Sequence, residues 1–590
     1  MSHKSEDCVR LKKQTREIRS VKELFEIEQK PKTLLLWFPP FRKDSDAEIS
    51  QNAFEQIAKF CEKTHEQTTI CILTTPPDAA RLLPFLEKSL RYQLWVAVKN
   101  KKSPKNSIEG QLDQRHSALL VMSRYQSSLK HTITRIAYTF CPACGKTTKD
   151  YGGKKHIYNP YGTLLSDVWR DIQIHAPSDI EEIENRLQDV FGLSPYEVLE
   201  VLDMRKYREL KPAEDFGALN DNTLNLFQTR RAMPQDSRLI NGDCLTSLAT
   251  IPDNSIDFCF ADPPYNLQKK YDHWNDALEA KDYFAWCDKW LSELARVIKP
   301  GRAVAVINIP LWAVRHYQHL SNILRFQSWI AWDGLSLPVR MIMPSHYAII
   351  CFSKGEPRPL PGLESDFLAT HASKNSLPME EFFCIRSNCV SSRNKLKPTD
   401  RTDFSDLWYD IHRLKHNSRR VDHPCQLPPA LMRRLYTLFT KPNEIILDCF
   451  DGAGTSTLVA HQMNRRFIGI ELSAQYHKIA QERHDMILQG EDPFGKREEI
   501  PQSKNSRVER LQKQRYEVSK KDLQLEVRQI ARILGRLPTR DEVKDMSKHP
   551  IEYFENYFFS WGEVCAAARH DGMSELPSEA DTKILQPSLL

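Results

Sequence analysis

The pattern of apolar and polar residues predicts short buried strands in the second half of the chain, each closed by an acidic residue. The apolar runs start at Leu239, Ile256, Ile445 and Phe467, and the acids that close them are Asp243, Asp262, Asp448 and Glu471. Short apolar runs bounded by polar residues are typical of strands buried in a sheet. Helical segments are expected between them, among them 429–439. This alternation predicts an α/β fold, with a mostly parallel sheet and helices on both faces.

The stretch Asp262-Pro263-Pro264-Tyr265 is a candidate catalytic loop. An exocyclic amine of adenine or cytosine is a poor nucleophile, because its lone pair is delocalised into the ring. Asp262 can accept a hydrogen bond from such an amine, and the prolines stiffen the turn so that a nearby carbonyl oxygen can act as a second acceptor. Tyr265 offers a ring that can stack on a base taken out of the helix. The alternative is a Pro-Pro turn that only follows a core strand.

A second candidate site is the glycine-rich loop Asp448-Cys449-Phe450-Asp451-Gly452-Ala453-Gly454-Thr455. Gly452 and Gly454 let the backbone approach a ligand, and the helix expected after them points amide groups at it. Glu471 closes the next strand, where such folds bind ribose hydroxyls, and Asp243 is placed to contact the adenine end of a cofactor. The alternative is a loop for some other nucleotide.

A third motif, His423-Pro424-Cys425-Gln426-Leu427-Pro428, lies between the first two. The order of the motifs resembles the beta group of DNA amino-methyltransferases, whose sequence is circularly permuted relative to other methyltransferases. The resemblance covers residues 235–485 and implies a Rossmann-like, S-adenosylmethionine-dependent methyltransferase fold. It implies that the cofactor is bound by Asp243, His423, Gln426, Asp448, Phe450, Gly452, Gly454, Thr455 and Glu471.

The resemblance also implies the reaction, a site-specific methyl transfer to the exocyclic amine of a flipped base in double-stranded DNA. Asp262, Pro263, Pro264 and Tyr265 would be the catalytic residues, and the transfer needs no metal. The target-recognition segment is expected at 355–420, where Arg386, Arg393 and Lys395 would contact DNA.

Several alternatives remain open at this level. Asp at the first motif position is commoner for adenine N6 in this family, and Ser for cytosine N4, so adenine is expected and cytosine is the alternative. A catalytically silent DNA-binding protein is a third reading, which the intact motifs disfavour. Enzymes that act on RNA or protein more often carry Asn at this position. Without a convincing nuclease motif in the chain, a separate cognate restriction endonuclease is the expected partner in restriction-modification.

The first half of the chain repeats the second. Blocks at 35–41, 90–95, 116–120 and 166–172 match blocks at 260–265, 324–329, 346–350 and 405–411, in the same order. Phe38 replaces the catalytic acid, so residues 31–175 are expected to form a degenerate methyltransferase-like repeat without a cofactor site. We expect a monomer with an internal pseudo-dimer, or else a homodimer. The alternative is chance similarity between apolar segments.

Four cysteines suggest a structural zinc site shared by the two halves. Cys141 and Cys144 form a Cys-x-x-Cys pair, and Cys384 and Cys389 lie at the matching place in the second half. Four thiolates would complete a tetrahedral site. The alternative is a redox-active or structural pair, because the second spacing is wider than is usual.

The C-terminal segment 521–575 is expected to be a small helical module. Leu534-Gly535-Arg536-Leu537-Pro538-Thr539 and Phe558-Phe559-Ser560-Trp561 resemble a helical repeat associated with homing endonucleases. One helix should end at Gly535, a second should begin near Thr539 with a capping pattern, and a third should open at Tyr557. A row of basic residues favours DNA binding, with Arg536 at its centre: Arg528, Arg532, Arg536, Arg540 and Lys544. The alternative is a cap packed on the catalytic domain.

Composition is consistent with this assignment. The chain has 590 residues, a net charge of +6 and 14 Cys. Without a signal peptide, such cysteine usage predicts a reducing cytoplasm, and no apolar run is long enough to span a bilayer. The expected order of segments is an extension at 1–30, the repeat at 31–175, a connector at 176–234, the catalytic domain at 235–485, a linker at 486–520, the helical module at 521–575 and a tail at 576–590.

Overall fold

The computed structural model divides the chain into two units, Met1–Ile500 and Pro501–Leu590. It describes residues 13–27, 33–38, 47–49, 51–100, 110–124, 134–136, 140–141, 146–147, 163–174, 180–193, 199–204, 210–212, 236–266, 278–334, 346–363, 404–411, 426–495, 518–558 and 561–569. Each unit is considered by itself.

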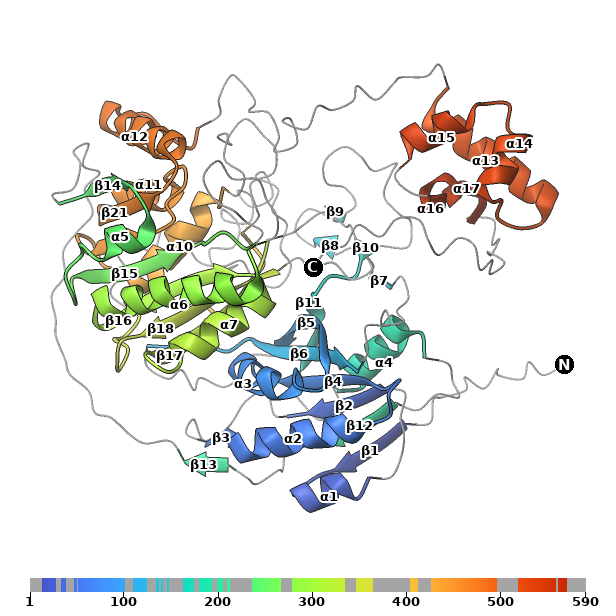
Figure 1. The fold of residues 1–590 in the computed structure, drawn as a ribbon, viewed down its shortest axis with the longest axis horizontal. Helices are drawn as coiled ribbons and strands as arrows, with labels where there is room; N and C mark the ends of the chain where they lie inside the picture. The colour runs from blue at the N-terminus through green and yellow to red at the C-terminus, as the bar shows by residue number, and fades with distance from the viewer. Residues whose placement is uncertain are drawn as a thin grey trace. The chain divides into compact units, whose positions relative to one another are not determined.

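The predicted strands of the second half form one eight-stranded sheet, in the order β14-β21-β20-β15-β16-β18-β17-β19 (Figure 1). Its strands are β14 (Arg238–Asn241), β15 (Ile256–Ala261), β16 (Ile298–Asn308), β17 (Arg325–Asp333), β18 (His346–Ser353), β19 (Leu407–Trp408), β20 (Ile445–Asp448) and β21 (Arg466–Glu471). All neighbours pair in parallel except β18, which is antiparallel to β16 and β17. The predicted α/β fold is therefore confirmed.

Helices cover both faces of this sheet because the side chains of each buried strand alternate between two cores. Cys259 and Ala261 of β15 pack with α5 (Cys244–Leu248), α6 (Ala280–Val297) and α7 (Pro310–Leu320). Phe258 and Phe260 pack instead with α10 (Pro429–Phe439) and α11 (Thr455–Gln462). The predicted helix 429–439 matches α10. Helix α12 (Ala474–Gln489) packs against α11 and β14.

The first half of the chain forms a second sheet, in the order β1-β12-β2-β4-β6-β5-β11. Its strands are β1 (Lys13–Glu17), β2 (Thr33–Trp37), β4 (Thr69–Thr74), β5 (Arg91–Asn100), β6 (His116–Ser123), β11 (Val168–Ile174) and β12 (Leu199–Asp203). From β12 to β11 this order follows that of β20-β15-β16-β18-β17-β19 strand by strand. The helices also correspond along the chain: α1 (Val21–Phe25), α2 (Gln51–Lys63), α3 (Pro76–Leu86) and α4 (Ile180–Phe191) take the places of α5, α6, α7 and α10.

The first sheet extends beyond the segment 31–175 that the sequence repeat marks. It includes β1, from the predicted extension 1–30, and β12, from the predicted connector 176–234, where α4 also lies. In the second half, β20 is followed by α11, β21 and α12, and β21 lies beside β20. In the first half β1 lies beside β12 instead. Among the described residues, the first half thus has no counterpart of the glycine loop and the helix that follows it.

Three short strand pairs complete the first unit. They are β3 (Ala47–Ile49) with β13 (Leu210–Pro212), β7 (Arg135–Ile136) with β10 (Thr163–Leu164), and β8 (Phe140–Cys141) with β9 (Lys146–Thr147). Cys141, the first cysteine of the predicted Cys-x-x-Cys motif, belongs to β8. Cys144, Cys384 and Cys389 lie outside the described residues, so the zinc site stays a prediction. The DNA-contacting residues Arg386, Arg393 and Lys395 lie outside them too.

The C-terminal unit is a set of short helices around its own apolar core. They are α13 (Lys520–Leu534), α14 (Arg540–Met546), α15 (Ile551–Tyr557), α16 (Trp561–Val564) and α17 (Ala566–Arg569). Helix α13 ends at Gly535, and Thr539 and Glu542 form a capping box at the start of α14, as predicted. The third predicted helix was misplaced: α15 ends at Tyr557, where that helix was expected to begin.

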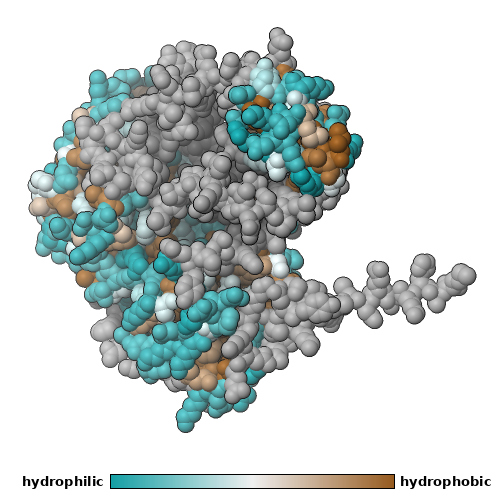
Figure 2. Space-filling model, turned by 45° about the vertical axis from the view of Figure 1, so that its right-hand side comes forward, coloured by the Kyte–Doolittle hydropathy of each residue, from teal (hydrophilic) through white to brown (hydrophobic). Residues whose placement is uncertain are grey.

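The predicted basic row of this unit is not continuous, because Gly535 stops α13 before the row reaches Arg536. Arg536 donates to Glu542 Oε2 at 2.8 Å, and Arg540 Nε donates to Glu555 Oε1 at 2.7 Å. Both side chains stabilise the packing of short helices. Figure 2 shows the surface of the described residues in this view as largely hydrophilic, with smaller hydrophobic areas. None of the helices in the described ranges is both long and apolar enough to cross a membrane.

Candidate active site

Most of the predicted site residues line a single pocket. Parallel strands β14, β15, β20 and β21 all end at the same edge of the sheet, so the residues that follow them converge there. The predicted residues on its wall are Asp243, Asp262, Pro263, Pro264, Tyr265, Gln426, Asp448, Phe450, Gly452, Thr455 and Glu471. Gly454 lies in the same loop, and His423 lies outside the described residues. The two motifs, nearly two hundred residues apart in the sequence, therefore form one site.

The candidate catalytic loop is held by the helices next to it. Tyr283 of α6 donates a hydrogen bond from its hydroxyl to the Pro264 carbonyl at 2.8 Å. Trp312 of α7 donates from its indole nitrogen to the Tyr265 carbonyl at 2.8 Å. These bonds fix the turn after β15 from two sides, so that Asp262 faces the pocket.

Tyr265 has a contact that the sequence did not predict. Its hydroxyl donates to Asp262 Oδ1 at 2.8 Å, and the side chain is 7% exposed. Its ring centroid lies 6.1 Å from that of Tyr347 in β18. The ring remains on the pocket wall, but the hydroxyl also orients the carboxylate of Asp262.

Two carboxylates accept hydrogen bonds from backbone N–H groups of the glycine loop. Glu471 accepts hydrogen bonds from the backbone nitrogens of Gly452, at 2.9 Å, and Ser473, at 2.8 Å. Asp448 Oδ1 accepts from the backbone nitrogen of Phe450 at 2.9 Å. These hydrogen bonds connect the end of β21 to the loop that leads from β20 into α11.

Gly454 is required by both conformation and space. Its φ is +82°, in the left-handed region that favours glycine, and a Cβ there would lie 2.8 Å from the Cβ of Ala480 in α12. Glycine therefore allows α12 to pack directly against the start of α11.

A buried chain of polar groups lies behind the glycine loop. The Thr457 hydroxyl donates to Asp451 Oδ2 at 3.0 Å, and His484 Nε2 lies 3.1 Å from that hydroxyl. His461 Nδ1 lies 3.0 Å from His484 Nδ1. Burial lowers the pKa of His484 to about 3, so its ring is neutral. Because a neutral imidazole donates from one nitrogen only, His484 donates to Thr457 and accepts from His461.

The pocket is rich in acids. Asp243, Asp262, Asp448, Asp451 and Glu471 all line it. The pKa of Asp448 is raised to about 7, mainly by burial and also by the nearby charges of Asp262 and Glu471. Burial also raises the pKa of Glu471 and, with the charge of Asp448, that of Asp451. These carboxylates repel one another in a desolvated place, so a cationic ligand would relieve their repulsion.

Flat apolar groups complete the wall. The ring of Phe450 lies 5.2 Å from Trp290 and 5.7 Å from Trp286, centroid to centroid, so α6 holds it in place. Leu472, next to Glu471, lines the pocket and is 42% exposed. The site therefore combines carboxylates with apolar surfaces on which a planar ring can pack.

Some residues of the wall could not be predicted from the motifs: Cys244, Trp286, Met432, Asp451, Leu472, Ser473 and Tyr476. Asp451, Leu472 and Ser473 adjoin predicted residues, so their position in the loops was a usable signal. Trp286, Met432 and Tyr476 come from helices and resemble ordinary core residues in the sequence.

Comparisons with known proteins follow the same division of the chain. Residues 256–482 match the family model of the N6/N4 type described as DNA methylase. Residues 518–569 match the family described as homing endonuclease associated repeat.

Among curated proteins, the chain is similar to two type II methyltransferases. It is 30% identical over 291 residues to M.BamHI of Bacillus amyloliquefaciens, which covers 48% of this chain and 64% of that protein. It is 28% identical over 271 residues to M.HpaI of Haemophilus parainfluenzae, which covers 44% of this chain and 78% of that protein. The chain thus spans less than two thirds of the first relative.

Among solved structures, the DNA modification methylase TTHA0409 of Thermus thermophilus, complexed with S-adenosyl-L-methionine, matches at 21% identity with a TM-score of 0.32, over 43% of this chain and 95% of that one. A likeness of that size carries no argument by itself.

Proposed function

Because residues 256–482 match the N6/N4 DNA methylase family model, we propose that this chain transfers a methyl group from S-adenosylmethionine to the exocyclic amine of a base flipped out of duplex DNA. The observation that carries the proposal is the common pocket of the Asp262 loop and the glycine loop. An amine acceptor and a nucleotide-binding loop face the same space, as methyl transfer between two bound molecules requires.

The residues of the pocket fit S-adenosylmethionine. The acids suit its ammonium and sulfonium charges. Among them, Asp448 is buried and lies close enough to Asp262 and Glu471 for their charges to raise its pKa. Glu471 already accepts two backbone N–H groups, and a carboxylate has about four lone-pair sites, so two are left for the ribose hydroxyls. Phe450 and Leu472 offer surfaces for the adenine ring, and Asp243, at the start of α5, is expected near its edge. When bound, the sulfonium supplies an electrophilic methyl group.

Asp262 prepares the amine for attack. Its Oδ1 accepts the Tyr265 hydroxyl, which orients the side chain, and we assign the carboxylate of Asp262 to the amine of the target base. Pro264 O accepts the Tyr283 hydroxyl, so we assign the second acceptor to the Pro263 carbonyl. Two acceptors draw the amine nitrogen towards a tetrahedral geometry, with its lone pair free for the methyl group. The carboxylate also stabilises the positive charge that develops on the nitrogen.

For the target base we propose adenine N6, on the resemblance of the motif that begins with Asp262. Cytosine N4 is the second candidate, because both exocyclic amines need the same pair of acceptors. We further propose that the C-terminal unit helps to bind DNA, supported by the match of residues 518–569, and that a separate restriction endonuclease shares the recognition sequence.

The base is settled by a product analysis. Unmethylated duplex DNA is incubated with the protein and labelled S-adenosylmethionine, then digested to nucleosides, and the labelled nucleoside is identified. N6-methyladenine is the expected product. N4-methylcytosine would keep the mechanism and change the base, whereas label in neither nucleoside would contradict the proposed function.

A further inference from the structure

The two halves of the first unit contact each other through reciprocal pairs. His346 and Asp167 belong to opposite halves, and His346 Nδ1 lies 2.9 Å from Asp167 Oδ2. His116 Nδ1 lies 3.1 Å from Asp406 Oδ2 in the reverse sense. Each histidine is the first residue of its strand, β18 or β6, and each aspartate precedes β11 or β19. All four side chains are at most 7% exposed.

Other contacts follow the same symmetry. Trp95 of β5 and Trp329 of β17 occupy equivalent places, and their rings stack with centroids 5.1 Å apart and planes 8° apart. Ala97 and Val168 from one half share a small apolar cluster with Ala331 and Leu407 from the other. Two surfaces that repeat each other's contacts in this way form an isologous interface, as in a twofold dimer.

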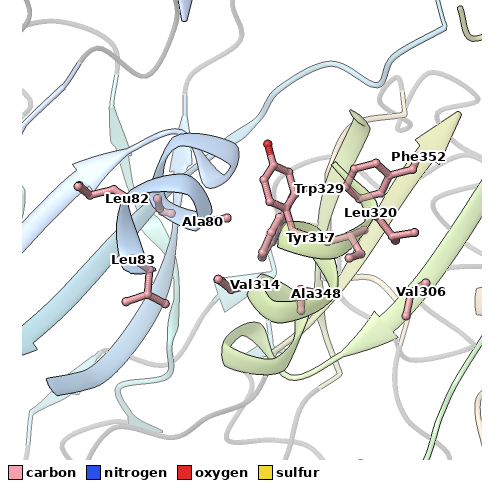
Figure 3. Packing of buried hydrophobic residues seen from close by; sticks show 14 of the residues in the cluster. Ala80, Leu82, Leu83, Val306, Val314, Tyr317, Leu320, Trp329, Ala348 and Phe352 are labelled. Atoms are coloured by element: carbon pink, nitrogen blue, oxygen red, sulfur yellow. The ribbon is translucent and has the colours of Figure 1, made fainter. Parts of the chain in front are cut away.

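Helices α3 and α7 extend this interface. Ala80 and Leu83 of α3 belong to the same buried cluster as Val314 and Tyr317 of α7. Figure 3 shows these side chains on the two sides of the contact, with Trp329 beside them. Arg315 of α7 and Glu87 at the end of α3 form an ion pair across it, at 2.5 Å. The apolar face of each half is therefore covered by the other.

A backbone hydrogen bond accompanies each pair, but only one of the two leads to a candidate catalytic loop. In one pair, Asp406 Oδ1 accepts from the backbone nitrogen of Arg115, at 2.6 Å. The backbone nitrogen of His346 also donates to Asp167 Oδ1, at 3.3 Å, so Asp167 holds both the main chain and the ring at the start of β18. The next residue, Tyr347, has its ring 5.4 Å from Trp332 and 6.1 Å from Tyr265, which donates to Asp262. In the first half, Phe38 stands where Asp262 stands in the second.

We infer that the first half is a built-in second subunit, and that its Asp167 is a positioning residue for Tyr265 and Asp262 of the catalytic half. Asp167 acts through His346 and Tyr347, which fix the side of the pocket where the target base is bound. The inference rests on the proposed function, since Asp262 is the amine acceptor only in a methyltransferase. The first half, in which Phe38 replaces the acid, thereby positions the catalytic loop of the other half.

The test compares Asp167→Ala with His116→Ala in the full-length chain. Each substitution lies in the first half and removes one of the two reciprocal histidine–aspartate contacts. Asp167→Ala also removes the bond to the His346 backbone nitrogen, so it should lower thermal stability somewhat more than His116→Ala. Asp167→Ala should lower the single-turnover rate of DNA methylation by about tenfold or more, because small displacements of reacting groups have large effects on rate. His116→Ala should change the rate by less than about twofold, and the affinity for S-adenosylhomocysteine should stay unchanged in both.

A conservative variant separates positioning from folding. In Asp167→Asn a side-chain oxygen remains for the His346 backbone nitrogen, so this variant should recover part of the rate that Asp167→Ala loses. Equal rates in Asp167→Ala and the wild type, or equal losses in Asp167→Ala and His116→Ala, would overturn the inference.

A spectroscopic measurement tests the positioning without any activity. Trp312 contacts the Tyr265 carbonyl from α7, so the ¹⁹F resonance of 5-fluorotryptophan at this position, assigned with Trp312→Phe, reports on the catalytic loop. The resonance should shift or broaden in Asp167→Ala and stay in place in His116→Ala. If it does so while the wild type methylates no DNA, the proposed function fails and the positioning stands; an unmoved resonance in Asp167→Ala contradicts the positioning.

Discussion

Asp262 and Tyr265 act as one unit at the scale of the residue. The Tyr265 hydroxyl donates to one oxygen of the Asp262 carboxylate, and both residues line the pocket. A carboxylate that is free to rotate would present its acceptor to the amine only part of the time. The hydrogen bond therefore contributes to catalysis through orientation.

Removing this hydroxyl gives a direct test of that role. Tyr265→Phe keeps the ring on the pocket wall but releases Asp262, so the methylation rate at saturating DNA should fall by about tenfold. The affinity for S-adenosylhomocysteine should not change. Tyr436→Phe serves as the matched control, because it also removes a buried tyrosine hydroxyl, which donates to the Ser456 carbonyl at 3.1 Å and not to Asp262. Equal rates for Tyr265→Phe and the wild type would show that Asp262 needs no such orientation.

The buried acids predict a dependence of stability on pH. The pKa of Asp448 is raised from its ordinary value to about 7, so the native state holds a proton that the unfolded chain has lost. The ligand-free protein should therefore lose stability as the pH rises from about 4 to about 7, with a slope of up to about 1.4 kcal/mol per pH unit from this group. Denaturant unfolding of the wild type and Asp448→Asn should show a shallower decline in the variant. Identical slopes would mean that Asp448 is ionised in the native state throughout.

Single residues were the part of the site that the sequence located best. Asp262, Asp448 and Glu471 lie beside recognisable runs, because strand ends and glycine loops are local in the chain. The Tyr265–Asp262 bond and the mutual repulsion of the acids could not be predicted, since they depend on how distant strands converge. The wall residues Trp286 and Tyr476 were missed because nothing in the neighbouring sequence distinguishes an aromatic pocket residue on a helix from an aromatic core residue.

At the scale of the element, the shape of the glycine loop depends on the close packing of α12 against the loop between β20 and α11. The sequence predicted the strand, the glycines and the helix, but not that α12 would lie against Gly454. It also predicted α10 and the capping box of α14, both set by neighbouring residues. It placed one C-terminal helix start at Tyr557, where α15 ends with Phe558 as its cap, whereas α16 begins at Trp561.

Replacing Gly454 tests this packing. Gly454→Ala combines a positive φ with a Cβ 2.8 Å from that of Ala480, and it should lower stability by about 2 kcal/mol or more and weaken cofactor binding. Gly355→Ala is the matched control for stability, because its φ is +71° and no atom lies within 4 Å of the added Cβ. Its loss should be limited to about 1 kcal/mol, the backbone strain alone. Thermal unfolding and calorimetric titration with S-adenosylhomocysteine measure both effects, and equal losses would show that the approach of α12 has no importance.

At the scale of the whole molecule, two sheets of matching strand order share one isologous interface. The sequence repeat indicated the relation through four blocks, but these blocks include neither β1 nor β12. The lost glycine loop explains why only one half keeps a cofactor pocket among the described residues. The division between a catalytic half and a positioning half is what distinguishes the chain from two copies of one enzyme.

The internal interface predicts the state of the chain in solution. Because each half already covers the apolar face of the other, the protein should be a monomer with a mass near 68.6 kDa in light scattering after gel filtration. Arg315→Glu, which reverses one side of the ion pair with Glu87, should destabilise the monomer without changing its mass. A wild-type dimer that Arg315→Glu splits into monomers would place this surface between two chains instead.

The most direct test of the account is methyl transfer from labelled S-adenosylmethionine to unmethylated duplex DNA, measured side by side for the wild type and Asp262→Ala. Calorimetric titration with S-adenosylhomocysteine shows whether each protein still binds the cofactor product. The account predicts incorporation by the wild type, a loss of at least about a hundredfold in Asp262→Ala, and equal affinity for the cofactor product in both. Incorporation at the same rate in both proteins, or none in a wild type that binds the cofactor product, would contradict it.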